Sequence, residues 1–203
     1  MDPRRRRLKI ALGAAFLAGA SFAVSAAPAL AVTECTYYVD GPTDITVQAG
    51  EVACGGEGDD SVGWVYGTFI GRGGDDTASY VPGRFIGGGG DDLAYYIYGS
   101  YAGGDGNDVA YYVFGTFDGG DADDSVYYVY GSFNGGDGSD SVGYVFGTFS
   151  GGAGKDSVVF LYGTFNGGDG RDSVTAMVDG TFNGGNGKDT VSSYYGGTLI
   201  SVP

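Results

Sequence analysis

One unit of a tandem repeat reads Gly135-Gly136-Asp137-Gly138-Ser139-Asp140-Ser141-Val142-Gly143-Tyr144-Val145-Phe146-Gly147-Thr148-Phe149-Ser150. Units of the same form begin at Gly55, Gly71, Gly87, Gly103, Gly119, Gly135, Gly151, Gly167 and Gly184. Successive starts lie 16 residues apart, except for a last interval of 17 residues. A fixed short period is typical of a solenoid, in which each repeat forms one coil. We therefore number the positions of a unit from 1 to 16.

The composition excludes several classes of protein. The chain has 203 residues with 43 glycines, but only five prolines and no Gly-X-Y period, so it is not collagen-like. Its 17 tyrosines and 12 phenylalanines are untypical of a disordered chain. The net charge of −15 leaves no basic surface for nucleic acid and indicates cations as partners. Histidine is absent, which removes the commonest general base and transition-metal ligand.

Residues 1–31 have the layout of a secretory signal peptide. A basic segment, Arg4 to Lys9, precedes an apolar segment from Ile10 to Val24 and the small-residue cleavage signal Ala29-Leu30-Ala31. The alternative is a membrane anchor, but the apolar segment is short and ends at a cleavage signal. We expect a secreted or cell-surface protein with no membrane insertion after cleavage. The choice between the general and the twin-arginine export route is open.

Residues 32–54 are predicted to form an N-terminal cap. Cys35 and Cys54 are the only cysteines, and in an exported protein an isolated pair of cysteines is typical of a disulfide. Short strands are expected at 36–39 and 45–47. A redox-active pair is the alternative, but there is neither a C-x-x-C motif nor a neighbouring cation to favour it. The first coil of a solenoid needs such a cap.

The repeat predicts an all-β fold, a right-handed parallel β-roll or β-solenoid of about nine 16-residue coils over residues 55–203. Glycine at positions 1, 2 and 4 indicates a tight turn there. Val or Ala at position 8 and Phe at position 15 are expected to face inward, on strands that stack about 4.8 Å apart. A second turn is expected at positions 11–13, with position 11 inward and the aromatic residues at 10 and 12 outward. The reverse orientation, with 10 and 12 inward, is also open. The 17-residue unit is expected to place Asp179 as a bulge in the second turn.

Position 6 is aspartate in every unit, and stacking would place these side chains in one column. The column consists of Asp60, Asp76, Asp92, Asp108, Asp124, Asp140, Asp156, Asp172 and Asp189. Further acids occupy positions 3 and 5 of the same segment: Glu57, Asp59, Asp75, Asp91, Asp105, Asp121, Asp123, Asp137 and Asp169. Carboxylates about 5 Å apart repel by about 0.8 kcal/mol in water and about 3 kcal/mol at an effective dielectric of 20.

Such a column predicts bound cations. Carboxylates and turn carbonyls form an all-oxygen site of the kind that calcium accepts, whereas magnesium demands stricter geometry and zinc or copper favour His and Cys. The alternative is structural, with each Asp capping its own turn. In later units position 5 is Lys155, Arg171 or Lys188, which would weaken sites or act as internal counter-ions.

The segment from Gly135 to Val142 resembles the haemolysin-type, glycine-rich calcium-binding repeat of RTX proteins, G-G-x-G-x-D-x-U-x. The resemblance extends over residues 55–200. It implies a parallel β-roll that folds on binding calcium, held between glycine turns by the position-6 carboxylates and backbone carbonyls. That family alternates two such motifs per coil, whereas this chain keeps one, so we expect a single calcium column with about eight sites. We do not expect the catalytic and pore-forming activities of the family to carry over, because residues 32–203 are accounted for by the cap and the repeats.

The function expected from the sequence is that of a secreted calcium-binding β-roll with a structural or adhesive role. One alternative is a self-assembling surface protein that associates end to end. Another is an ice-binding or adhesion solenoid that uses a Thr/Ser ladder at position 14 together with the Tyr ladders. An enzyme is not expected, since the acids form a repeated column and there is no nucleophile elbow or P-loop.

Overall fold

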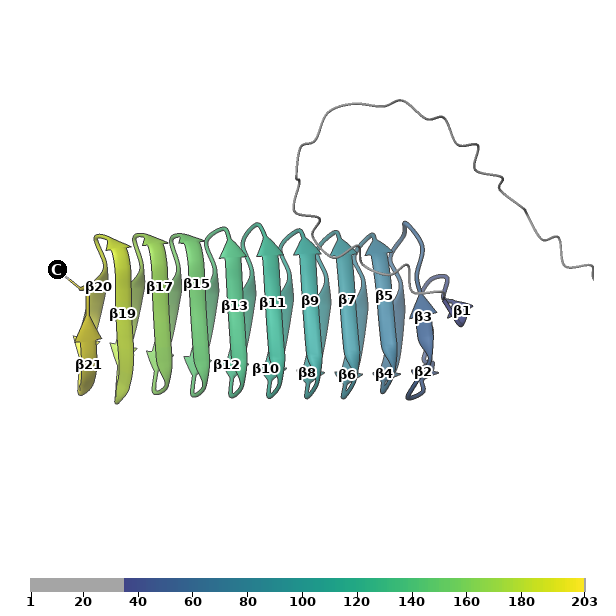
Figure 1. The fold of residues 1–203 in the computed structure, drawn as a ribbon, viewed down its shortest axis with the longest axis horizontal. Helices are drawn as coiled ribbons and strands as arrows, with labels where there is room; N and C mark the ends of the chain where they lie inside the picture. The colour runs from purple at the N-terminus through teal and green to yellow at the C-terminus, as the bar shows by residue number, and fades with distance from the viewer. Residues whose placement is uncertain (1–34, 203) are drawn as a thin grey trace, which may run out of the picture. The chain divides into compact units, whose positions relative to one another are not determined.

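The computed structural model describes residues 35–202 (Figure 1). The predicted signal peptide, residues 1–31, lies outside the described residues. The described part consists of strands and turns that form two parallel sheets, and it contains no helix. No helix long and apolar enough to cross a membrane occurs among these residues.

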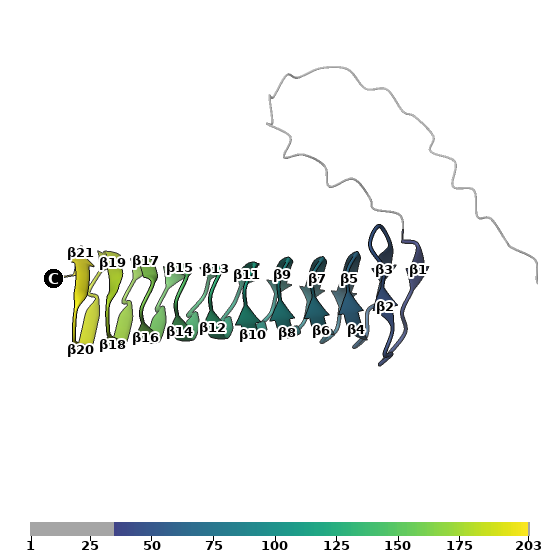
Figure 2. The same ribbon diagram turned by 90° about the horizontal axis from the view of Figure 1, so that it is seen from below.

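Each coil supplies one strand to each sheet. Sheet A contains β1 (Tyr37–Tyr38), β3 (Val52–Cys54), β5 (Thr68–Gly73), β7 (Arg84–Gly89), β9 (Ser100–Asp105), β11 (Thr116–Asp121), β13 (Ser132–Asp137), β15 (Thr148–Gly154), β17 (Thr164–Gly170), β19 (Gly180–Gly187) and β21 (Gly197–Ile200). Sheet B contains β2 (Thr46–Val47), β4 (Ser61–Val65), β6 (Thr77–Val81), β8 (Leu93–Ile97), β10 (Val109–Val113), β12 (Ser125–Val129), β14 (Ser141–Val145), β16 (Ser157–Leu161), β18 (Ser173–Met177) and β20 (Thr190–Tyr194). Figure 2 shows the two sheets facing each other along the solenoid.

The strands pair in steps of one repeat, so that like residues stack. Val142 pairs with Val158 in sheet B, and Phe149 pairs with Phe165 in sheet A. The predicted all-β, parallel β-solenoid of 16-residue coils is therefore confirmed. Asp179 lies in the turn between β18 and β19, as predicted for the 17-residue unit.

The core is built from positions 8, 11 and 15, which face inward in the regular coils. Phe133 and Phe149 are buried, and their ring centroids lie 4.9 Å apart with an interplanar angle of 5°. The side chains of Val129 and Val145, at position 11, are fully buried. The rings at positions 10 and 12 are partly or largely exposed and form outward ladders, for example Tyr112 above Tyr128 at 5.1 Å. The expected orientation of positions 10 to 12 is thus confirmed and its reverse is excluded.

The glycine segment differs from the prediction in its placement. Positions 1 to 3 are not a turn: they continue the sheet-A strand, and the chain turns at positions 4 to 6. Glycine is favoured within the strand because position 2 has a positive φ, as at Gly136 with φ 116°; Arg72 is the exception, with φ 89°. An added Cβ at Gly136 would lie 2.1 Å from the carbonyl oxygen of Gly120 in the preceding coil.

The cap extends the same two sheets by one short coil. Tyr37 pairs with Ala53, and Ala53 pairs with Phe69, while Thr46 of β2 pairs with Trp64 of β4. The predicted strands at 36–39 and 45–47 are present in shorter form as β1 and β2, and β3 was not predicted. The predicted disulfide joins Cys35 and Cys54.

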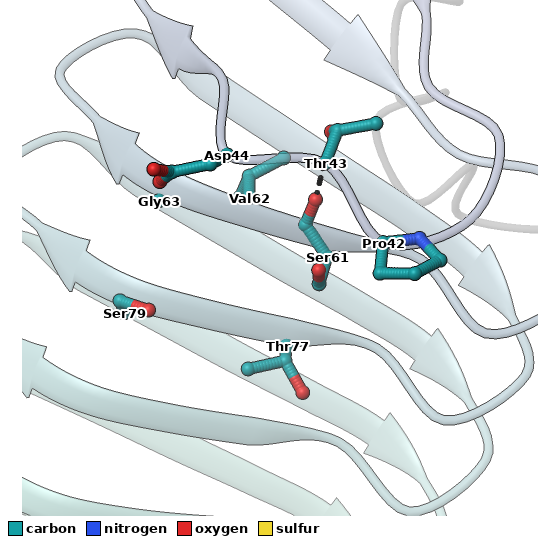
Figure 3. A pocket seen from close by; sticks show the side chains of 8 residues that line it. All are labelled: Pro42, Thr43, Asp44, Ser61, Val62, Gly63, Thr77 and Ser79. Carbon is teal, nitrogen blue, oxygen red and sulfur yellow. Dashed lines mark hydrogen bonds between the residues drawn. The ribbon is translucent and has the colours of Figure 1, made fainter.

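The segment between β1 and β2 lies against the first repeat. The hydroxyl group of Thr43 donates a hydrogen bond to the carbonyl oxygen of Ser61, at 3.0 Å (Figure 3). A shallow pocket of about 330 Å³ opens here, lined by small and polar residues around Pro42, Ser61 and Thr77. Arg72, at position 2 of the next coil, reaches back to the cap, with its guanidinium group 5.4 Å from the ring centre of Tyr38.

Candidate metal centre

The nine position-6 aspartates form one column where the glycine turn leads into sheet B. Each is the residue directly before a sheet-B strand, and none is more than 3% exposed. The column is therefore internal. These residues stack in one column, as predicted, but the sequence did not predict that the column is buried.

One carboxylate oxygen of each aspartate joins neighbouring coils. The backbone N–H of Asp108 donates to Oδ1 of Asp124, and the N–H of Asp124 donates to Oδ1 of Asp140, both at 2.8 Å. The same bond, at 2.8–3.0 Å, recurs from Asp60 to Asp189. In these eight coils the side chain thus binds the backbone of the preceding coil and does not cap its own turn.

The cap supplies the partner that the first aspartate would otherwise lack. The backbone N–H of Gly41 donates to Oδ1 of Asp60 at 2.6 Å, and the N–H of Gly56 donates to Oδ2 at 2.7 Å. Gly41 thus takes the place of a preceding aspartate. No repeat pattern marks Gly41, and this role was not apparent from the sequence.

The second carboxylate oxygen is buried without a partner in the other eight coils. The eight atoms are Oδ2 of Asp76, Asp92, Asp108, Asp124, Asp140, Asp156, Asp172 and Asp189. A buried polar atom without a partner costs free energy, and a buried charge without one costs more. Each Oδ2 therefore requires a proton or a cation.

The orphaned oxygen explains why position 1 is glycine. A Cβ added to Gly103 would stand 1.9 Å from Oδ2 of Asp108 and 2.6 Å from the carbonyl oxygen of Gly119 in the next coil. The carboxylate oxygen and the carbonyl oxygen thus border the same space beside the Cα of Gly103. Oxygen atoms from two neighbouring coils thus lie close together there, and oxygen is the ligand atom that hard cations prefer.

Burial raises the pKa of seven of the column carboxyls. Loss of hydration is the main cause, hydrogen bonds from the preceding aspartates oppose it, and neighbouring carboxylates add to it in most coils. The pKa rises from the ordinary value of 3.8 to about 7 for Asp76, Asp92, Asp108 and Asp156, to about 8 for Asp124 and to about 6 for Asp140. The pKa of Asp172 is also raised, through burial. Near neutral pH the column therefore accepts either protons or cations.

The auxiliary acids predicted to share this site lie elsewhere. All nine are exposed. Asp105, Asp121, Asp137 and Asp169 lie in the last residues of sheet-A strands, and the other five lie outside the strands, in the turn segment. Several position-5 side chains form a second ladder, in which Oδ1 of Asp59 accepts the N–H of Asp75, and Oδ1 of Asp75 accepts that of Asp91, both at 2.9 Å. Residues 35–202 contain no group of three or more His, Cys, Asp or Glu side chains placed to hold one metal ion. A cation in the column would thus rely on position-6 carboxylates and backbone carbonyls.

Tyr101 is a further member of the column that the sequence analysis missed. It is the one tyrosine among the phenylalanines at position 15, its ring is buried, and its hydroxyl group lies 3.3 Å from Oδ1 of Asp108. Burial and the nearby carboxylates raise the pKa of Tyr101 well above its ordinary value, so the hydroxyl group is a donor. The departure from Phe at position 15 was the signal that could have identified it.

The geometry defines a class of protein: a parallel β-solenoid with an internal aspartate column. No protein-family model matches the chain, and no curated protein matches it. One solved structure is similar, described as a hyperactive, Ca2+-dependent, β-helical antifreeze protein from an Antarctic bacterium. The match has 17% identity and a TM-score of 0.39, and it covers 84% of this chain and 82% of the other. A similarity of this degree assigns no residue and no ligand to the present chain.

Proposed function

We propose that this protein is a secreted, calcium-binding β-solenoid in which calcium neutralises the internal aspartate column. The observation that supports the proposal is the row of eight buried Oδ2 atoms without a hydrogen-bond partner. The ligands would be these carboxylate oxygens and carbonyl oxygens of the glycine segments, such as that of Gly119 beside Asp108. Calcium would supply positive charge where the fold buries a carboxylate in every coil, and the resemblance to RTX repeats points to the same ion.

Binding would be coupled to folding. The unfolded chain brings no two coils together, so it offers no preformed site, and calcium would stabilise the folded state. The predicted signal peptide and the disulfide favour a location outside the cell, where disulfides persist. We propose a structural or adhesive role and no enzymatic activity, with the column serving stability.

Far-UV circular dichroism tests the proposal by titrating the protein with calcium, then with a chelator, and with magnesium as the control ion. We expect β-sheet signal to appear cooperatively with calcium and to be lost on chelation. A folded spectrum that is indifferent to calcium at pH 8 would refute the metal-binding function and leave a protonated or plain structural column.

A matched pair of variants assigns the site to the column. Asp124→Asn removes one charge inside the column while an amide oxygen remains for the N–H of Asp108. Asp123→Asn changes the exposed neighbour in the same way. We expect the first variant to bind less calcium, measured by calorimetry, and the second to bind as much as the wild type. Equal losses in both variants would place calcium on the outer side of the turn.

Sheet A supports binding to a regular surface such as ice as a second candidate function. Positions 14 and 16 form two outward columns, and from β13 to β19 they contain Ser132, Thr148, Thr164 and Thr181 beside Asn134, Ser150, Asn166 and Asn183. Thermal hysteresis of the calcium-loaded protein tests this candidate. Thr164→Tyr should abolish any hysteresis, because a large ring would disrupt the flat face.

End-to-end association, the alternative expected from the sequence, has its support at β20 and β21. These are the last strands of their sheets in the described part, and Leu199 and Ile200 are 43% and 47% exposed. Unpaired strand edges are templates for a further chain. Sedimentation velocity of a Leu199→Lys/Ile200→Lys variant tests this association, which the charges should suppress.

A further inference from the structure

On the outer side of the glycine turn, acidic side chains lie in the first coils and basic side chains lie in the last coils. We call the nine position-5 side chains the loop edge: Asp59, Asp75, Asp91, Asn107, Asp123, Ser139, Lys155, Arg171 and Lys188. All nine are exposed. Reading along the chain, three acids are followed by Asn, Asp and Ser, and then by three bases. The two ends of the same edge thus carry opposite charge.

Hydrogen bonds between coils order the acidic part of the loop edge. Oδ1 of Asp75 accepts the N–H of Asp91 at 2.9 Å, and Oδ1 of Asp91 accepts the N–H of Asn107 at 2.8 Å. These bonds use Oδ1 and leave Oδ2 of each acid for a partner. In the basic part of the loop edge, Gly154 and Gly170 pair in register between neighbouring coils. Lys155 and Arg171 come directly after these paired glycines, so they occupy equivalent positions in the two coils. Each triplet is a column of like charges about one coil spacing of 4.8 Å apart.

We propose that two copies of this chain associate side by side and antiparallel through their loop edges. A two-fold axis at Asp123 reverses the order of the column in the second copy. Asp59 then faces Lys188, Asp75 faces Arg171 and Asp91 faces Lys155, while Asn107 faces Ser139. At each end of the dimer, the acids of one copy thus face the bases of the other. The spacing between coils is the same in both copies because the two chains are identical. An isologous contact of this kind closes on itself.

Other charged groups on this side set the character of the contact. Asp123 would meet its own copy, Asp121 would also meet its own copy, and Asp105 would face Asp137, so the centre of the dimer is acidic. Asp169 lines a groove together with Lys155 and Arg171 and offsets part of their charge. Exposed ion pairs are individually weak and are screened by salt. The dimer should therefore be reversible and should dissociate at high ionic strength.

Sedimentation velocity tests the arrangement with calcium-loaded protein at low and high ionic strength. The wild type should be dimeric at low ionic strength and monomeric at high ionic strength. K155D/R171D/K188D and D59K/D75K/D91K should each be monomeric alone, and an equal mixture of the two should form heterodimers at low ionic strength. A wild type that stays monomeric, or a mixture that does not dimerise, would overturn the proposal.

Two controls separate loss of contact from loss of fold. D59N/D75N/D91N removes the charges but keeps the oxygen acceptor, as Asn107 does when it accepts the N–H of Asp123. This variant should keep its circular dichroism spectrum and lose the dimer. End-to-end association through β20 and β21 would not respond to any of these substitutions, and that result would count against the loop edge.

A cysteine cross-link tests the antiparallel register. Asp123→Cys places a thiol on the proposed axis, facing its own copy, and should give a covalent dimer under mild oxidation at low ionic strength. Asp75→Cys faces Arg171 in the dimer and should not. Equal cross-linking of both variants, or no cross-linking of the Asp123→Cys variant, would exclude the closed antiparallel arrangement.

Discussion

The aspartate at position 6 performs two tasks with its two oxygens. Oδ1 fixes the backbone of the preceding coil, while Oδ2 faces the glycine at position 1 of its own coil. A carboxylate is the only side chain of this size with two acceptor oxygens. The repetition of aspartate in nine units therefore follows from coil stacking and does not by itself require a metal. The orphaned Oδ2 is the part of the residue that points to a cation.

Gly103→Ala should disrupt this arrangement. The added methyl group would stand 1.9 Å from Oδ2 of Asp108 and 2.6 Å from the carbonyl oxygen of Gly119, so both must move. We expect a loss of roughly 1–3 kcal/mol in the free energy of unfolding, as for other overpacked sites, and weaker calcium binding. Gly56→Ala is the control, since its nearest neighbour would be 3.9 Å away. Denaturant unfolding of both variants measures the difference, and equal stability would contradict the prediction.

Ala122→Gly should stabilise the protein. Ala122 occupies position 4 with φ 81°, a left-handed conformation that costs a non-glycine residue about 1–2 kcal/mol. Glycine removes this cost but gains freedom in the unfolded chain, so we expect a net gain of up to about 1 kcal/mol. The midpoint of thermal unfolding in calcium should rise, and a fall would show that the methyl group makes a favourable contact.

At the scale of elements, the sequence predicted which strands form in the repeats and which faces they bury, because strands pair one repeat apart and the period therefore sets the register of both sheets. It did not predict β3 of the cap. It did not predict where the strand ends and the turn begins. Glycine signals a positive φ, and in this fold a positive φ occurs inside the sheet-A strand at Gly136 as well as in the turn at Gly138. The same residue type thus serves two structures, and the pattern cannot separate them.

The division of the acids into two groups also escaped prediction. Asp124 is buried and Asp123, one residue earlier, is exposed. Adjacent residues at a turn point to opposite sides, but the sequence does not say which side faces the core when both residues are aspartate. The role of Gly41 as a backbone donor to Asp60 leaves no sequence signal, since every residue except proline carries an N–H.

The cap is the element most dependent on its disulfide. β1, β2 and β3 contain only two or three residues each, and the loop between Cys35 and Cys54 spans 19 residues. Cys35→Ser/Cys54→Ser should cost about 3 kcal/mol through the entropy of the unfolded loop. Hydrogen exchange should show the loss first at the amides of residues 36–54, while the central coils stay protected. Uniform deprotection of all coils would contradict a local role.

At the scale of the whole molecule, the column couples stability to pH in an unusual direction. Carboxyls whose pKa is about 7 in the fold and 3.8 in the unfolded chain hold more protons when folded. Without calcium, stability should therefore be greatest near pH 4 and fall as the pH rises through about 7. Calcium competes with these protons, so its affinity should rise over the same range.

Thermal unfolding in chelator across this pH range measures the effect. The midpoint should decrease with pH in chelator and recover when calcium is added at pH 8. Asp137→Asn should leave the profile unchanged, because this exposed carboxylate lies outside the column and is not among the charges that raise the pKa of its members. A midpoint that increases with pH in chelator would mean that the column carboxyls are ionised in the fold without a cation.

The outward ladders of aromatic rings allow excitation energy to be transferred along the solenoid. Trp64 is the only tryptophan, and it stands at the first position of a ladder that continues through Tyr80, Tyr96, Tyr112 and Tyr128. The ring centroids are 4.4–6.5 Å apart, close enough for light absorbed by the tyrosines to pass from ring to ring. Tryptophan is the lowest-energy acceptor, so Trp64 should emit light collected by distant coils. Its emission on tyrosine excitation would then report, in a single intensity, how many coils remain stacked.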